Sequence, residues 1–276
     1  MLRFDQHLHT YFSGDSRENP ENYVINGLKK GFTGITITDH MDLDYPYEPE
    51  GKFEFDVDKA FEEFALLKEK YFGSFEIGRG IEIGLRAEAD KYEQMRERLD
   101  AIVEAHPFDA VIGSVHMLDN VDLFYPEYWE GKKPGDCVKN YFESSLFCLS
   151  YYDCFDIFGH FDYIVRYAPV DKSFYKPSDY SDITDLMLKK LVEKGKALEV
   201  NTKSLQPEYG LNAPNPGAGV IKRYLELGGE LVTVGSDAHS AEKLGSYFAQ
   251  GEEILKACGV QYLAVYRNRK PIMIKI

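Results

Sequence analysis

Residues 110–116 read AVIGSVH, a short apolar run of the kind that forms a buried strand, with a histidine directly after it. The same arrangement occurs at residues 34–40, GITITDH, and at residues 231–239, LVTVGSDAH. Between such runs the chain carries longer segments with apolar residues at helical spacing. We therefore predict strands that alternate with helices, an order typical of a parallel sheet with helical crossovers.

Counting along the chain gives eight strand-like runs, at residues 2–4, 34–38, 75–83, 110–115, 155–158, 197–201, 231–235 and 262–266. Helices are predicted at residues 20–30, 56–71, 87–105, 136–152, 182–194, 220–227 and 247–258. Seven or eight such units in about 250 residues favour a closed α/β barrel, which we expect to form one domain over residues 1–276. An open doubly wound sheet is the alternative. It would need a glycine-rich nucleotide loop after the first strand, where HLHTYFSGDS (residues 7–16) stands instead.

Composition excludes several classes of protein. The 276 residues are 44% hydrophobic and 28% charged, as in globular proteins, and the formal net charge of −14 argues against a nucleic-acid partner. We expect no membrane segment, because no apolar run approaches the roughly 18–20 residues that one needs. The opening MLRFDQHLHT is too acidic and polar for a signal peptide. Four cysteines without a CxxC pair predict a reducing, cytoplasmic location.

Six of the seven histidines follow predicted strands, and only His106 lies elsewhere. In a closed barrel the carboxyl ends of all strands open onto one face, so these six imidazoles should converge there. A single histidine after a strand is usually a satisfied polar residue, but six at one face need cations to pack together. His7 and His9 are two residues apart and therefore point to the same side of a strand, and Asp237 and His239 repeat that spacing.

Carboxylates accompany these histidines and complete a set of nine candidate metal ligands: His7, His9, Asp15, His40, Glu82, His116, His160, Asp237 and His239. Nine ligands exceed the four that one zinc site uses, so two or three divalent ions are predicted. Nitrogen and oxygen ligands without thiolate suit zinc, manganese or iron. The resulting positive pocket predicts a phosphate ester as substrate. Asp5 is expected behind these ligands, orienting an imidazole.

Seven segments together resemble the PHP (polymerase and histidinol phosphatase) superfamily, and most closely its stand-alone histidinol-phosphate phosphatases. They are DQHLHTYFSGDS (5–16), TDH (38–40), GIEIG (80–84), IGSVH (112–116), IFGHFD (157–162), EVNT (199–202) and GSDAH (235–239). The resemblance implies a distorted (β/α)₇ TIM-like barrel with three ions at the carboxyl ends of the strands. It also implies hydrolysis of L-histidinol phosphate to L-histidinol and phosphate, a step of histidine biosynthesis.

Carried over position by position, the resemblance divides the ligands among three ions. It implies one ion on His7, His9, Glu82 and Asp237, a second on Glu82, His116 and His160, and a third on Asp15, His40 and His239. A hydroxide bridging the first two ions is the expected nucleophile. The proton for the leaving alkoxide is expected from Asp237 or His239.

Contacts to the substrate are predicted less directly. Arg17 is the first candidate for a phosphate clamp, since a guanidinium binds phosphate through two hydrogen bonds. Lys203 and Ser204 after the sixth strand are further candidates, and Arg166 is a weaker one. Histidinol carries an ammonium and an imidazole, and the acidic loop that contains Asp42, together with Asp44 and Glu48, is expected to meet them.

Three other functions stay open at this point. A PHP phosphoesterase could act on a nucleotide, a nucleoside bisphosphate or a DNA end, although the negative charge disfavours DNA. An amidohydrolase-like enzyme also begins with an HxH motif, but such enzymes commonly bridge their ions with a lysine, where Glu82 stands here. A metal-binding protein without activity is the third. The sequence does not fix the native metal or the oligomeric state.

Overall fold

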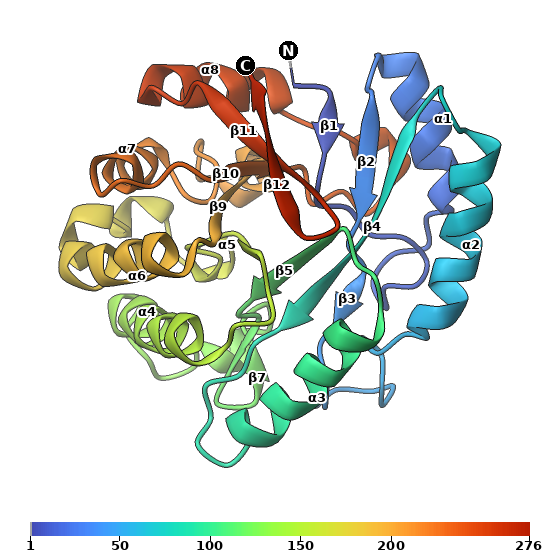
Figure 1. The fold of residues 1–276 in the computed structure, drawn as a ribbon. Helices are drawn as coiled ribbons and strands as arrows, with labels where there is room; N and C mark the ends of the chain where they lie inside the picture. The colour runs from blue at the N-terminus through green and yellow to red at the C-terminus, as the bar shows by residue number, and fades with distance from the viewer. Residues whose placement is uncertain (1) are drawn as a thin grey trace.

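A computed structural model describes residues 2–276 of the chain. Eight strands form one sheet, in which seven follow one another in the order β1-β2-β4-β5-β8-β9-β10 and a short eighth pairs with β4; the paired neighbours along this order are parallel. Figure 1 shows the long helices ringing the outside of these strands. The strands of the sheet are Phe4–Asp5 (β1), Gly34–Ile37 (β2), Glu76–Gly84 (β4), Ala110–Ser114 (β5), Ile157–Phe158 (β8), Ala197–Asn201 (β9) and Val232–Gly235 (β10). The helices are Pro20–Lys30 (α1), Val57–Lys70 (α2), Tyr92–Ala105 (α3), Pro134–Tyr151 (α4), Ile164–Tyr167 (α5), Ser181–Lys194 (α6), Ala218–Glu226 (α7) and Phe248–Cys258 (α8).

The sheet closes on itself just beyond β1 and β10. The backbone nitrogen of His9 donates to Ala238 over 2.8 Å, and that of Asp237 donates to His7 over 2.8 Å. Leu8 and Ala238 form an isolated parallel bridge between the two segments. The predicted (β/α)₇ barrel is therefore confirmed, and its seam lies beside four of the predicted ligands.

Local sequence explains where the helices begin and end. Asn19 caps α1 through its side chain, which accepts a hydrogen bond from the Glu21 backbone, and Gly31 ends the helix with a φ of 76°. Asp56 caps α2 in the same way. The start predicted for the third helix, at residue 87, is wrong by five residues, because the chain forms turns and loop until Tyr92. In this stretch Arg86 is buried and pairs with Glu88.

The last predicted strand belongs to a feature that the sequence reading missed. Tyr262–Arg267 (β11) pairs antiparallel with Lys270–Lys275 (β12), and Asn268 and Arg269 form the turn with φ values of 49° and 61°. A two-residue hairpin turn needs positive φ at both positions and usually carries Asn-Gly, so Asn-Arg gave no such signal. The segment is therefore a hairpin and not another βα unit, and Figure 1 shows it lying across the barrel in this view.

This hairpin covers the amino-terminal end of the barrel. The Gln6 side chain, inside the barrel, donates to Ala264 over 2.7 Å and accepts from the Tyr266 backbone over 2.8 Å. A small apolar cluster lies there, formed by Ala110, Ile112, Ile157, Ala197, Ala264 and Tyr266. The main core fills the space between the sheet and the helices.

Three short strands flank the other end of the barrel. His40–Met41 (β3) pairs with the end of β4, and Met117–Leu118 (β6) forms a small hairpin with Val121–Asp122 (β7). No helix within residues 2–276 combines the length and the apolar character needed to cross a membrane.

Candidate metal centre

Glu82 lies at the middle of the histidine cluster and is fully buried near the end of β4. Its Oε2 is 3.1 Å from His7 Nε2, and its Oε1 is 3.2 Å from His116 Nε2 and 3.0 Å from His160 Nε2. The Ser114 hydroxyl donates to the same Oε1 over 2.6 Å. One carboxylate thus joins side chains from three different strand ends.

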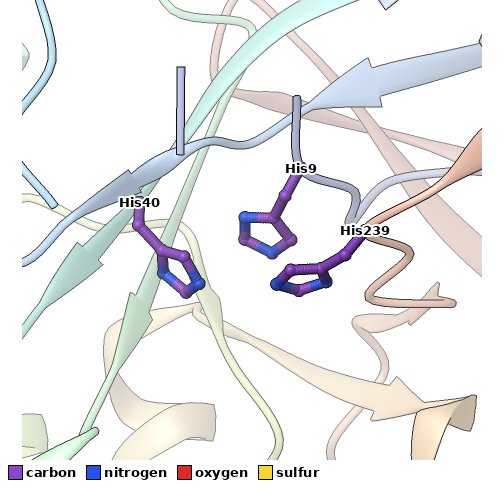
Figure 2. Close-up of side chains that lie close together, drawn as sticks. All are labelled: His9, His40 and His239. Atoms are coloured by element: carbon purple, nitrogen blue, oxygen red, sulfur yellow. The ribbon is translucent and has the colours of Figure 1, made fainter. Parts of the chain in front are cut away.

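A second group of rings lies beside the first. Figure 2 shows His9, His40 and His239 pointing into one space, with His9 and His239 coming from the two sides of the barrel seam. The His9 ring centroid is 4.2 Å from that of His40 and 4.3 Å from that of His239. Asp15 reaches this group from the loop after β1, with its Oδ2 3.0 Å from His239 Nε2 and 3.7 Å from His40 Nε2.

Asp237 lies beside both groups of histidines and pairs with two cationic side chains. Its Oδ1 is 3.5 Å from His9 Nε2 and 3.0 Å from Lys203 Nζ, while Arg166 Nη1 donates to its Oδ2 over 2.9 Å. Its backbone φ of 52° is uncommon for a residue other than glycine. Such a conformation persists where the surrounding contacts determine it, and here it aims the carboxylate at the histidines.

Carboxylates and a hydroxyl also contact the outward nitrogens of several rings. His7 Nδ1 is 2.5 Å from Glu199, His116 Nδ1 is 2.8 Å from Asp42, and His9 Nδ1 is 3.1 Å from the Ser13 hydroxyl. Metal-binding histidines usually make such a contact on the nitrogen that faces away from the ion.

The role expected of Asp5 is wrong. Its carboxylate accepts hydrogen bonds from the backbone nitrogens of Ser236 and Gly245, each over 3.0 Å, and from the Ser236 hydroxyl, so it connects β1 to the segment that follows β10. It contacts the backbone of His7 over 3.3 Å and no imidazole. The i, i+2 spacing put it on the right side of the strand, but Glu199 occupies the position next to the ring.

Proton affinities in this cluster are strongly coupled. Burial lowers the pKa of His116, but the carboxylates of Asp42 and Glu82 outweigh it, so the pKa lies well above its ordinary value. Burial and the neighbouring rings of His40 and His239 hold the pKa of His9 well below its ordinary value, and burial lowers that of His160 to about 4. Burial raises the pKa of Glu82, yet the surrounding imidazoles bring it well below the ordinary value. Neighbouring groups thus favour opposite protonation states.

Divalent cations fit this arrangement. The buried ring nitrogens His9 Nε2, His40 Nδ1 and His160 Nδ1 make no hydrogen bond. Among residues 2–276, several sets of three ligand atoms lie within 4.8 Å of one another, including His7, His9 and Glu82, then Glu82, His116 and His160, and then His9, His40 and His239. Neutral imidazoles and carboxylates are the donors that zinc and similar ions take. Bound cations would also supply partners to buried ring nitrogens that otherwise have none.

A cavity of about 330 Å³ opens above the cluster. Its wall includes predicted ligands together with cationic, acidic and aromatic side chains: Asp15, His40, Asp42, Tyr45, Lys52, Phe53, His116, Asp122, Phe124, Tyr125, Tyr163, Tyr167, Lys203 and His239. A volume of this order suits a small molecule.

Of the residues predicted to contact the substrate, some line the cavity and others do not. Lys203 lines the cavity, but Arg17 is exposed on the outer surface and does not line it. Ser204 is fully buried, where it bonds to the Asn215 side chain and accepts from Arg166 over 3.2 Å. Asp42 lines the cavity, but both of its oxygens also face histidine rings.

The remaining acidic loop residues and His106 lie away from the cavity wall. Asp44 is exposed and pairs with Arg98 over 2.7 Å, and Glu48 lines a separate surface hollow. His106 follows α3 and contacts the backbone of that helix over 2.7 Å, as expected of a residue outside the cluster.

Two residues of the site were missed from the sequence. Glu199 lies in the buried strand ALEVN between two residues that pack on the helices, and a carboxylate at such an inward position was a usable signal. Asp122 comes from the β6–β7 hairpin, which no pattern predicted. It lines the cavity and accepts from the Tyr45 hydroxyl over 2.8 Å.

Residues 5–203 match the family model of the PHP domain, so the chain belongs to the PHP domain family. It is 36% identical to a probable histidinol-phosphatase of Clostridium acetobutylicum, over 94% of each chain. It is 30% identical to a probable histidinol-phosphatase of Thermotoga maritima, over 99% of each. The crystal structure of histidinol phosphate phosphatase from Lactococcus lactis, complexed with zinc, L-histidinol and phosphate, superimposes with a TM-score of 0.87. That match is 25% identical in sequence and covers 99% of this chain and 100% of the other.

Proposed function

We propose that this protein is a metal-dependent phosphomonoesterase that hydrolyses L-histidinol phosphate to L-histidinol and phosphate, a step of histidine biosynthesis. The observation that carries the proposal is the cluster of six histidines and three carboxylates under one small cavity. A relative that aligns over 99% of this chain holds zinc, L-histidinol and phosphate. The alternatives of nucleotide hydrolysis and C–N bond hydrolysis have no comparable support.

The ligand sets proposed for three ions are those that the resemblance implies, and they differ from the groups described above in giving His9 to the first ion, although its ring lies beside His40 and His239. His7, His9, Glu82 and Asp237 would hold one ion, and Glu82, His116 and His160 a second; Asp15, His40 and His239 would hold the third. When bound, such ions lower the pKa of coordinated water and neutralise charge on a phosphoryl group. We expect zinc, manganese or iron to serve.

Lys203 is the best placed cation for the substrate phosphate. Its Nζ lines the cavity 3.0 Å from Asp237 and 3.3 Å from His239 Nδ1. Burial lowers its pKa, but the Asp237 carboxylate outweighs that and keeps the ammonium charged. It can therefore attract the phosphate and orient it toward the histidines.

The leaving alkoxide needs a proton, for which Asp237 and His239 are the two candidates. Burial raises the pKa of Asp237, but Lys203 and His7 bring it well below its ordinary value, so this carboxyl stays ionised. An ionised carboxylate accepts a proton and does not donate one. We therefore assign to His239 the orientation of a water that donates the proton, because an imidazole that also holds an ion does not readily give up its remaining proton.

Asp122 and the aromatic side chains around it would receive the cationic part of histidinol. The Asp122 carboxylate is held by the Tyr45 hydroxyl and by the Phe124 backbone, each over 2.8 Å, so it is fixed in the cavity wall. Tyr163 and Tyr167 complete the wall. A carboxylate among aromatic faces is a favourable environment for an ammonium or imidazolium.

Charge and thiol chemistry bear on partners and location. We expect no nucleic-acid partner, given the net charge of −14. Cys137, Cys148, Cys154 and Cys258 are buried free thiols, which is consistent with a cytoplasmic enzyme acting on a small molecule.

The test is phosphate release from a panel of phosphomonoesters, combined with elemental analysis of the same preparation. We expect two to three ions per chain and a preference in kcat/KM for L-histidinol phosphate over nucleoside monophosphates, nucleoside bisphosphates and p-nitrophenyl phosphate. Asp122→Asn should raise KM for histidinol phosphate about tenfold and leave KM for p-nitrophenyl phosphate, whose leaving group carries no cation, unchanged. A wild-type preference for nucleotides would overturn the proposed substrate, and protein with no metal would overturn the proposed chemistry.

A further inference from the structure

Glu199 lies directly behind the proposed ligands and is not one of them. It is 1% exposed, on β9, with Leu198 and Val200 on either side packed in the main core. Its Oε1 is 2.5 Å from His7 Nδ1, and its Oε2 accepts from the backbone nitrogen of His160 over 2.7 Å. One carboxylate therefore contacts residues that follow two other strands, β1 and β8.

We propose that Glu199 is a positioning residue that sets which nitrogen of His7 binds an ion and fixes the backbone from which His160 reaches Glu82. The inference rests on the proposed function only in that these histidines bind cations. Glu199 therefore increases the affinity of the enzyme for a metal ion without binding that ion itself.

The chemistry of the two contacts gives the first part of the argument. Glu199 Oε2 accepts from the His160 backbone and its Oε1 lies 2.5 Å from His7 Nδ1, so the hydrogen bond to Oε1 keeps a ring proton on Nδ1. Nε2 lies on the other side of the ring, 3.1 Å from Glu82, and is the nitrogen that can bind an ion once the ion displaces its proton. A ring turned or protonated otherwise would present N–H to the ion site.

The second contact acts on the main chain. His160 has a φ of 20°, a sparsely populated conformation, and its nitrogen donates to Glu199. The side chain that leaves this backbone reaches Glu82 with Nε2 at 3.0 Å. Fixing the amide therefore helps to fix the ring.

The contact between Glu199 and His7 depends on a glycine in the neighbouring strand. A Cβ on Gly235 would lie 2.3 Å from His7 Cβ and 2.6 Å from Glu199 Oε1. Only glycine lets β10 pass this close to the pair. The Asn201 side chain supports Glu199 Oε2 from the other side over 3.3 Å.

Glu199→Gln is the informative change because it keeps the shape and removes one acceptor. An amide group must turn its NH₂ toward His7 or toward the His160 backbone. Facing His7, it forces the ring proton onto Nε2, the nitrogen that should bind an ion. If the NH₂ faces His160, it meets the backbone N–H of that residue, so two donors face each other and the hydrogen bond that fixes this backbone is lost.

Asp5→Asn is the matched control. Asp5 is another fully buried carboxylate near His7, but it bonds to Ser236 and Gly245 and to no ring. Its replacement should lower thermal stability without changing the imidazoles.

The experiment strips each protein with a chelator and titrates it with zinc against a chromophoric competitor. Glu199→Gln should weaken binding of one zinc ion about 10- to 100-fold, whereas Asp5→Asn should stay within about threefold of wild type. Wild-type affinity in Glu199→Gln, or equal losses in both variants, would overturn the inference.

A second measurement does not need the variant to fold. In zinc-loaded wild-type protein labelled with ¹⁵N at histidine, His7 should carry a proton on Nδ1 and the ion on Nε2. Zinc on Nδ1 would overturn the inference. Neither measurement uses a substrate, so a different preferred ester would overturn the proposed function alone, and a wild-type protein that takes up no zinc would overturn both.

Discussion

At the amino-terminal end of the barrel, Arg267 faces Glu76 and Arg269 faces Asp156, while at the other end several histidines crowd around Glu82. Both arginines of the hairpin thus have a carboxylate partner within the chain. At the histidine end, buried ring nitrogens lack partners and neighbouring groups favour opposite protonation states. The first end is complete as folded, whereas the second is complete only with cations, so stability and function are separated along the barrel axis.

Replacement of Glu82 should break the histidine end most completely. Glu82→Gln removes the charge shared by two proposed ions, and we expect kcat/KM to fall on the order of 10³-fold or more, because water is not activated without them. The control is Glu76→Gln, at the other end of the same strand, which should leave kcat/KM unchanged. Equal activity in the two variants would contradict the comparison.

Gly235→Ala should be the next most damaging change. The added Cβ would overlap His7 and Glu199, and overpacking at a tight site costs about 1–3 kcal/mol of unfolding free energy. We expect lower zinc content together with a lower midpoint in denaturant unfolding. Gly219→Ala, where nothing lies within 4 Å in helix α7, should instead stabilise the protein by up to about 1 kcal/mol. Wild-type zinc content in Gly235→Ala would show that the site tolerates the displacement.

Stabilisation by zinc should grow with pH. In metal-free protein burial lowers the pKa of His7 and His116, but carboxylates outweigh it and raise both. Groups with a raised pKa stabilise the fold fully below their unfolded pKa of about 6.5, and this stability is lost as pH rises through the folded value. Zinc must displace these protons, so its binding strengthens over the same range.

Calorimetry with and without zinc checks this expectation. A concentration of about 100 times Kd should add about 2.7 kcal/mol to the free energy of unfolding. The gain should be larger at about pH 8.5 than at about pH 6, since ligand protons compete less there. A gain that is equal at both values, or larger at the acidic one, would mean that these imidazoles do not bind the ion.

Arg269→Ala should have the smallest effect on activity. It removes a bidentate contact to Asp156 and should lower unfolding free energy by about 2 kcal/mol, with kcat/KM and zinc content unchanged. Arg223→Ala, at a solvent-exposed ion pair, should change the free energy of unfolding far less than Arg269→Ala does. Loss of activity in Arg269→Ala would show that the two ends are coupled.

Sequence alone predicted the barrel because short apolar runs and helical spacing alternate with little interruption. It also predicted which histidines come together, since the carboxyl ends of parallel strands share one face. The contacts of carboxylates with the outward nitrogens of these histidines were harder to predict. Which carboxylate meets which ring depends on strand register and not on spacing in the sequence. Asp5 and Glu199 differ in this way, and the loop placing Asp122 carries no periodic signal. Arg17 as a phosphate clamp stays a prediction, since this exposed side chain does not line the cavity and only kinetics would test it.

The seam of the barrel has a consequence for the order of events during synthesis. His7 and His9 are synthesised more than 220 positions before Asp237 and His239, and Asp15 meets His239 across 224 positions. A nascent chain that stops short of β10 lacks one wall of the cluster. Contacts of such long sequence separation form late and slowly in folding. The full set of ions can therefore be taken up only after the residues that follow β10 have been synthesised, and zinc uptake by chains that stop before and after them would report when the barrel closes.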